Sequence, residues 1–335
     1  MSGSIELSLP SGPAGARILS VGAYRPRRVV DNAEMCTYID STPEWIESRS
    51  GITQRRWAAE DETVPMMAAA ASRVALERAG MSASDLDMIL VATCSNLTPT
   101  PSSANRLQAA LGAHSGALEV NSACAGFCHA LGMANDLVRG GSVRHVLVVG
   151  AERLSDITAK GDRSSAFLFA DGAGAVVVGP SENPGIGPTV YGSWGELGDT
   201  LVTSPSIRSI FDDATLGRPA LTMAGQAVFR WSVYEMPKVA QAALDAAGVK
   251  ADQLDAFIGH QANIRILEAM ARAFGLPEHV VVADDIRTMG NTSAASIPLA
   301  LDALLAQGRV RSGDLALLLG YGGGLSHAAQ VVTIP

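Results

Sequence analysis

An internal duplication constrains the fold of this chain more than any other feature. Residues 75–90 align with residues 243–258 at a constant offset of 168, and both copies have the pattern of a helix, a glycine turn and a strand. Residues 121–131 resemble residues 291–301 at an offset of 170. Two equivalent halves are therefore expected, each built from the same order of elements.

Each half contains a short apolar run typical of a buried strand, at residues 144–149 and 315–319. Because helical patterns separate the strands, we expect mixed, mainly parallel sheets that helices cover on both faces. The 335 residues allow two domains or one large duplicated one. We place the N-terminal half at residues 1–182 and the C-terminal half at residues 183–335.

Three chemically active residues each occupy a glycine- or serine-rich turn: Cys124, His260 and Asn291. The run after Cys124 has helical spacing, so the thiol is expected near a helix N-terminus, where the dipole favours a thiolate. A thiolate attacks thioesters, and a neutral histidine and a carboxamide can donate hydrogen bonds to the developing oxyanion. This pattern predicts thioester chemistry. The duplication would bring the turns of Cys124 and Asn291 together at the junction of the halves, a common place for a site.

Several other interpretations of these residues are less consistent with the sequence. A lone cysteine is most often a small core residue, and Cys36, Cys94 and Cys128 fit that description. Cys128 follows Cys124 by four residues, but no second pair completes a metal site, so no metal is expected. A papain-type protease also has Cys, His and Asn in this order along the chain. Its nucleophile, however, lies in a turn with a preceding cysteine and a following aromatic residue, and no such turn surrounds Cys124. The glycine run at 320–325 lacks the third glycine of a dinucleotide fingerprint.

Composition and charge exclude several classes of partner. A net charge of −8 argues against nucleic-acid binding, and the most apolar runs are too short to span a bilayer. The N-terminus lacks the pattern of a signal peptide, and the four cysteines lack the spacing of a disulfide framework. We therefore expect a cytoplasmic protein.

The motifs around these residues resemble the β-ketoacyl-acyl-carrier-protein synthase III family of thiolase-fold condensing enzymes, over nearly the whole chain. The matching segments are 44–52, 123–127, 169–175, 260–263, 290–296 and 321–324. The resemblance implies a five-layered αβαβα subunit of the α/β class with two pseudo-symmetric halves, and a homodimer. It also implies a triad of Cys124, His260 and Asn291, with the N–H groups of Cys124 and Gly323 as the oxyanion hole.

The same resemblance implies an acyl-CoA primer and malonyl-acyl carrier protein (malonyl-ACP) as substrates, with no bound cofactor. Cys124 would take the acyl group, and a decarboxylative Claisen condensation would give 3-ketoacyl-ACP, in fatty-acid initiation or polyketide starter-unit synthesis. One alternative is an acyltransferase with an oxygen or nitrogen acceptor, and another is a non-catalytic homologue. The intact triad argues against both alternatives.

Further site residues follow from the resemblance. Trp45 and Arg49 lie four residues apart in a short helical segment, hence on one face. The coenzyme A contacts implied are Trp45, Arg49, Arg163 and Asn263. We expect the acidic carrier protein to dock on a basic patch of Arg230, Arg265 and Arg272, of which Arg265 and Arg272 lie seven residues apart on one helical face. A solvated Arg beside a core Trp is the ordinary interpretation of such a helix.

Two positions depart from the family pattern. Gly259 stands where proline is common, which removes a backbone restraint next to His260. Thr100 stands where short-chain members place a phenylalanine that reaches across the dimer to close the acyl pocket. The smaller Thr100 predicts a roomier pocket and a longer or branched primer.

Overall fold

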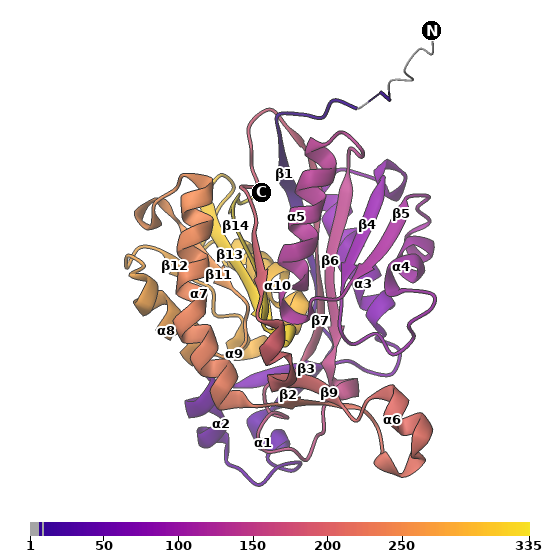
Figure 1. The fold of residues 1–335 in the computed structure, drawn as a ribbon, viewed down its shortest axis with the longest axis vertical. Helices are drawn as coiled ribbons and strands as arrows, with labels where there is room; N and C mark the ends of the chain where they lie inside the picture. The colour runs from indigo at the N-terminus through magenta and orange to yellow at the C-terminus, as the bar shows by residue number, and fades with distance from the viewer. Residues whose placement is uncertain (1–6, 9) are drawn as a thin grey trace.

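Two five-stranded sheets form the centre of the molecule (Figure 1). The computed structural model describes residues 7–8 and 10–335, so the first residues, on which the expectation of no signal peptide rests, lie mostly outside it. The first sheet has the order β1-β7-β6-β4-β5 and the second β8-β14-β13-β11-β12. The strands of the first sheet are β1 (Gly15–Tyr24), β4 (Met88–Ala92), β5 (Gly116–Val120), β6 (Val146–Arg153) and β7 (Asp171–Ser181). Those of the second are β8 (Val190–Ser193), β11 (Ala256–Gly259), β12 (Val281–Val282), β13 (Leu315–Gly322) and β14 (Ser326–Thr333).

The two sheets confirm the duplication, because equivalent strands occupy equivalent positions. The helices before β4 and β11 are α3 (Val64–Ala79) and α7 (Gly225–Ala247). They end at Gly80 and Gly248, whose φ angles of +63° and +66° are left-handed values that glycine adopts without strain. The helices after the two equivalent turns are α5 (Gly126–Arg139) and α10 (Ser296–Ala306).

Each sheet is mixed, with two parallel and two antiparallel strand pairs. We expected mainly parallel pairing, so the antiparallel share is larger than the sequence pattern indicated. In the second sheet the physical reason is local: a link of three residues joins β13 to β14. So short a link cannot make the crossover that a parallel pair requires, and it produces an antiparallel hairpin.

Five layers result from burial on both faces of both sheets. Alternate residues of β6, such as Val148 and Val149, enter different core clusters, and those of β13, such as Leu318 and Leu319, do the same. The inner cluster includes residues of α5 and α10, and both helices lie between the sheets (Figure 1). The outer layers are α3 with α4 (Ser103–Leu111) and α7 with α8 (Ile264–Phe274). This is the predicted αβαβα arrangement.

Two excursions depart from the repeat. The first comprises β2 (Arg28–Asp31), α1 (Asn32–Met35), α2 (Pro43–Ser50) and β3 (Gln54–Trp57). The second comprises β9 (Leu201–Ser204), α6 (Ile207–Asp212) and β10 (Ala220–Met223). A further short helix, α9 (Ile286–Met289), precedes the turn of Asn291. The first excursion packs Ile46 and Trp57 into the core cluster around Phe257 of the second sheet, although it belongs to the N-terminal half of the chain.

The predicted boundary between the halves, after residue 182, falls in the connection between β7 and β8. No helix in the described part of the chain has the length and apolarity needed to cross a bilayer.

Candidate active site

Cys124 lies in a 3₁₀ turn, Ala123–Ala125, directly before α5. Ala123 has a φ of +43°, and the equivalent residue of the other half, Ser293, has a φ of +47° in the turn before α10. A left-handed conformation in a residue other than glycine costs roughly 1–3 kcal/mol and persists only where the surroundings hold it. Both halves therefore hold the equivalent turn in the same strained geometry.

Glycines in the two central strands let these turns approach closely. A Cβ on Gly320 of β13 would lie 3.0 Å from Cα of Ala125, and a Cβ on Gly150 of β6 would lie 2.2 Å from the carbonyl oxygen of Ala294. Each turn thus sits directly on the central strand of the opposite half. The expected meeting of the two turns at the junction of the halves is confirmed.

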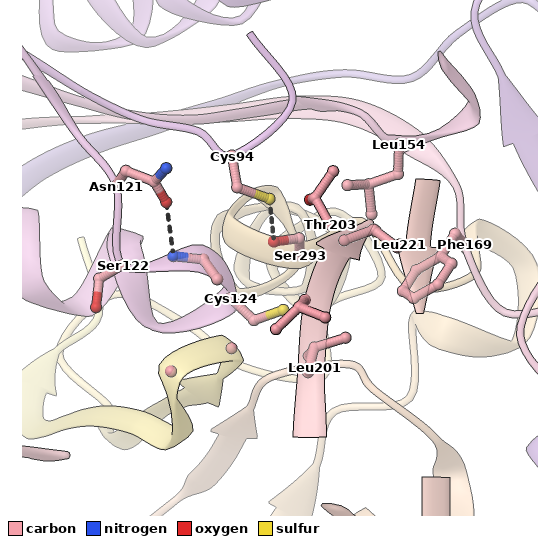
Figure 2. Close-up of a pocket in the computed structure, with 14 residues that line it drawn as sticks. Cys94, Asn121, Ser122, Cys124, Leu154, Phe169, Leu201, Thr203, Leu221 and Ser293 are labelled. Atoms are coloured by element: carbon pink, nitrogen blue, oxygen red, sulfur yellow. Dashed lines mark hydrogen bonds between the residues drawn. The ribbon is translucent and has the colours of Figure 1, made fainter. Parts of the chain in front are cut away.

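A cavity of about 360 Å³ opens beside Cys124 (Figure 2). Its apolar wall comes from Leu154, Phe169, Leu201 and Leu221, while Cys94, Ser293 and Gly323 lie around the thiol. Sequence reasoning missed the leucines, because they come from the 3₁₀ helix Leu154–Ile157 and from the two strands of the hairpin β9–β10. No local pattern marks them as neighbours of Cys124.

The predicted pocket residue Thr100 does not line this cavity. Thr100 lies in an exposed turn of the single subunit. A contact of Thr100 with the acyl group therefore stays a prediction that requires a second subunit.

His260 follows β11 and is buried, with an exposed fraction of 2 %. Its backbone N–H donates to the carbonyl of Leu319 (2.8 Å), and its Nδ1 lies 2.8 Å from Oγ of Ser296. Because Ser296 Oγ also accepts the N–H of Gln261 (3.3 Å), its own O–H is available to donate to Nδ1. When Ser296 donates in this way, the ring proton of neutral His260 is on Nε2. These bonds restrain His260 despite Gly259, whose carbonyl accepts from the Gln261 side chain (2.8 Å).

Burial sets the protonation state of His260. It lowers the pKa of the imidazole to about 3, because the cation loses its hydration and gains no anionic partner. His260 is therefore neutral at physiological pH and can act as a hydrogen-bond donor without carrying a charge.

We expect the His260 ring to stay neutral between pH 5 and pH 8, since its pKa in the folded protein is about 3. NMR of the imidazole Cε1–H should show a constant shift over that range in the folded protein. The same histidine in urea should titrate near its ordinary value of 6.5. Because the unfolded chain then binds a proton that the native state excludes, the free energy of unfolding should fall as the pH drops below 6.5. A His260 signal that titrates above pH 5 in the native state would contradict this assignment.

Asn291 is held in place by hydrogen bonds of both its backbone and its side chain. Its N–H donates to Leu168 (2.8 Å) and its carbonyl accepts from Ala170 (2.9 Å). The side-chain Oδ1 accepts the N–H of Ser293 (2.9 Å) and so secures the strained turn. With Oδ1 engaged, Nδ2 is the part of the amide that can donate to a substrate.

The end of β13 links Cys124 and His260. The rings of His260 and Tyr321 meet edge to face, with centroids 5.3 Å apart. The next residue, Gly322, lies against Cys124, since a Cβ there would lie 2.6 Å from Cβ of Cys124. Ser293 lines the same cavity as Cys124 and stands two residues from Asn291. The fold therefore gathers Cys124, His260 and Asn291 from both halves around one junction.

The expected thiolate at Cys124 is wrong for the resting state. Burial raises the pKa of the thiol to about 12, and the nearby charge of Glu152 adds to the increase. Hydrogen bonds from Ser293 and from the N–H groups of Cys124 and Gly323 lower the pKa only in part. A helix terminus contributes roughly 1 kcal/mol, less than one pKa unit, which is too little to offset burial. Cys124 is therefore a neutral thiol in the resting protein, and it would have to lose its proton to act as a nucleophile.

The predicted coenzyme A contacts lie close together near α2. This helix begins with Pro43 after the Thr42 cap and ends at Gly51, as the sequence indicated. The guanidinium carbons of Arg163 and Arg49 lie 4.6 and 5.8 Å from the centre of the Trp45 ring. Asn263 caps α8 by accepting the N–H of Arg265 (2.9 Å), and its Nδ2 donates to the carbonyl of Arg49 (3.0 Å).

The predicted docking arginines lie on the same side. A groove of about 420 Å³ is lined by Arg49, Phe229, Arg230 and Arg265. The guanidinium carbon of Arg265 lies 5.8 Å from the centre of the Phe229 ring. Arg272 lies two turns further along α8, exposed and outside the groove.

Comparisons with known proteins agree with this geometry. A family model described as 3-oxoacyl-[acyl-carrier-protein (ACP)] synthase III matches residues 118–195. A second model, described as the C-terminal part of the same enzyme, matches residues 244–334. A Streptomyces coelicolor β-ketoacyl-[acyl-carrier-protein] synthase III is 52% identical, covering 97% of this chain and 98% of the relative. The chain belongs to the 3-oxoacyl-[acyl-carrier-protein] synthase III family.

Other members of the synthase III family extend this result. A Mycobacterium avium β-ketoacyl-[acyl-carrier-protein] synthase III is 50% identical over 98% of this chain and 99% of its own length. The crystal structure of the priming β-ketosynthase from the R1128 polyketide biosynthetic pathway superposes with a TM-score of 0.97. It is 48% identical and covers 99% of both chains. The protein is accordingly an acyl-transferring condensing enzyme with the thiolase fold.

Proposed function

We propose that this enzyme joins an acyl-CoA primer to malonyl-ACP by decarboxylative condensation and so starts acyl-chain assembly, in fatty-acid or polyketide synthesis. One observation carries the proposal. Cys124 opens onto an apolar cavity of about 360 Å³, at a junction to which the other half contributes a neutral His260 and Asn291. A nucleophile, a site for an acyl chain and two uncharged donors are what the two stages of this reaction require.

In the first stage, the Cys124 sulfur attacks the thioester carbonyl of the primer. The N–H groups of Cys124 and Gly323, which lower the pKa of the Cys124 thiol, would donate to the oxygen that becomes negative. CoA leaves, and the acyl chain lies against Leu154, Phe169, Leu201 and Leu221. Burial of that chain favours the acyl-enzyme at about 0.8 kcal/mol for each methylene.

In the second stage, malonyl-ACP enters and loses CO₂. The electron pair released moves onto the thioester oxygen, where Nε2–H of His260 and Nδ2–H of Asn291 would stabilise the enolate. A neutral His260 suits this role, because a fixed donor is needed and no proton has to be transferred. The enolate carbon attacks the acyl carbonyl, the bond to Cys124 breaks, and 3-ketoacyl-ACP forms.

The experiment that tests this function offers the enzyme a panel of acyl-CoAs of different length and branching. Intact-protein mass spectrometry should show one acyl group on Cys124, and malonyl-ACP should then discharge it with release of CO₂. An adduct that transfers to an alcohol or amine, with no CO₂ released, would favour the acyltransferase alternative instead.

A homodimer and a cytoplasmic location form part of the proposal. Strand β5 is an edge of the first sheet, and Leu118 on it and Leu97 beside it are 46% and 65% exposed. An unpaired edge with exposed leucines is suited to pairing with a second copy, and Thr100 lies in the same exposed turn as Leu97. All four cysteines are unpaired thiols, which agrees with a reducing compartment.

Replacing Arg272 with glutamate should weaken docking of the acidic carrier protein without affecting coenzyme A. Arg272 is exposed and lies outside the groove at Arg49, so charge reversal should raise the KM for malonyl-ACP about fivefold, equivalent to about 1 kcal/mol. The KM for acyl-CoA should not change. Arg144→Glu, the same charge change just before β6, is the matched control. Equal KM values for malonyl-ACP in both variants would remove Arg272 from the docking surface.

A further inference from the structure

Glu152 is a buried carboxylate to which the proposed mechanism assigns no role. It lies in β6, has no exposed surface, and is the equivalent, 170 residues earlier, of Gly322 beside Cys124. Its oxygens accept hydrogen bonds from Oγ1 of Thr93 (3.1 Å), the N–H of Cys94 (3.1 Å) and Oγ of Ser95 (2.5 Å). Such a group is costly to bury, and three nearby donors hold it at the floor of the site.

A chain of polar side chains runs from Glu152 to Cys124. The thiol of Cys94 donates to Oε1 of Glu152 (3.4 Å), and its sulfur lies 3.7 Å from Oγ of Ser293. Figure 2 shows Ser293 between Cys94 and Cys124, with all three at the cavity. Ser293 lines the cavity beside Cys124, and it lowers the pKa of both Cys124 and Glu152. A hydroxyl can accept one proton while it donates another.

The titratable groups that face this carboxylate are two thiols. Cys94 follows β4, and Cys124 lies in the turn before α5. The turn before α10 contributes only neutral groups, which are Ser293 and the N–H of Ala294 (3.4 Å). On β7 the paired residue is Gly172. The adjacent Arg153 pairs with Asp156 (3.2 Å), and Asp171 accepts from Ala58 and Ser155. Burial raises the pKa of Glu152, and its hydrogen bonds with Ser95 and Cys94 lower it only in part, so its carboxylate can take up a proton.

We propose that Glu152 is the positioning residue that holds the proton of Cys124 while the enzyme is acylated, with Ser293 and Cys94 as the relay. The inference rests on the proposed role of Cys124 as nucleophile. In the first stage the S–H bond of Cys124 breaks, the proton passes through Oγ of Ser293 and the thiol of Cys94, and an O–H bond forms on Glu152. The CoA thiolate that leaves takes its proton from solvent. When condensation expels the Cys124 thiolate, Glu152 returns the stored proton to it, and the resting thiol is restored.

The test is the pH dependence of the acylation rate, measured as single-turnover CoA release with an acyl-CoA. If the proton moves within the enzyme, the number of protons on the pair does not change, and the wild-type rate should stay within about twofold from pH 7 to pH 9. In Glu152→Gln the proton must leave to solvent. The rate should then rise about tenfold for each pH unit, because the Cys124 pKa of about 12 comes mainly from burial and stays above this range.

Control variants separate a proton store from a merely structural carboxylate. Asp171→Asn neutralises another buried carboxylate, which contacts neither thiol, and should keep the flat profile. Ser293→Ala should show the steep profile of Glu152→Gln, and it tests the relay if Glu152→Gln does not fold. Alanine is tolerated at this backbone geometry, since Ala123 already occupies the equivalent position.

Two results would overturn the inference: parallel pH profiles in wild type and in both variants, or a wild-type rate that itself rises tenfold per pH unit. A wild-type protein that never forms an adduct on Cys124 would instead refute the proposed function. Intact mass measured in the same samples tells these outcomes apart.

Discussion

Replacing Cys124 with serine is expected to abolish the acyl-enzyme. The thiol pKa of about 12 is already high, and a serine hydroxyl is a still weaker acid in the same buried turn. After incubation with acyl-CoA, the mass of the variant should equal that of the untreated protein. CoA release by the variant should fall to the detection limit, because the serine hydroxyl at position 124 stays protonated and does not attack the thioester.

Cys128→Ser is the matched control for this experiment. Cys128 is buried in α5 one turn after the nucleophile, and its thiol pKa is also raised to about 12, yet it does not line the cavity. This variant should acquire the acyl group as the wild type does. An adduct that survives in Cys124→Ser, or that maps to Cys94 in the wild type, would assign the nucleophile to another residue.

Removal of either proposed enolate donor should give the second largest effect, and it should fall on condensation. His260→Ala and Asn291→Ala should each slow CO₂ release from malonyl-ACP by roughly 100- to 1,000-fold, the usual loss for one such donor. Acylation of Cys124 should change far less, because neither donor acts on the primer carbonyl. Separate assays of CoA release and CO₂ release measure the two stages.

Two further variants make this prediction sharper. Asn291→Asp keeps an oxygen to accept the N–H of Ser293 but removes the Nδ2 donor, so it tests donation with the strained turn still capped. Ser296→Ala removes the partner of His260 Nδ1 but leaves the ring, and it should cost less than His260→Ala. Equal losses in the two assays would contradict the division of labour between Cys124 and the two donors.

Much of the fold was predictable because the sequence contains two copies of the same order of helices and strands. The matching glycines Gly80 and Gly248 and the apolar strands before Glu152 and Gly322 repeat at nearly constant spacing, so the two-half architecture follows from local patterns. The pairing direction of the strands was less predictable. It depends on how each connection returns to the sheet, as the three-residue link from β13 to β14 illustrates.

The sequence by itself determined the elements, the duplication, the family and the three turns that carry Cys124, His260 and Asn291. Only the tertiary structure decided their chemistry, because desolvation depends on what surrounds a group in three dimensions. Burial turned an expected thiolate into a thiol and holds His260 neutral. The leucines of the cavity beside Cys124 and the contact of Glu152 with Cys94 come from segments far apart in the chain. No local pattern encodes such contacts, since they exist only once the two halves and the hairpin β9–β10 have packed together.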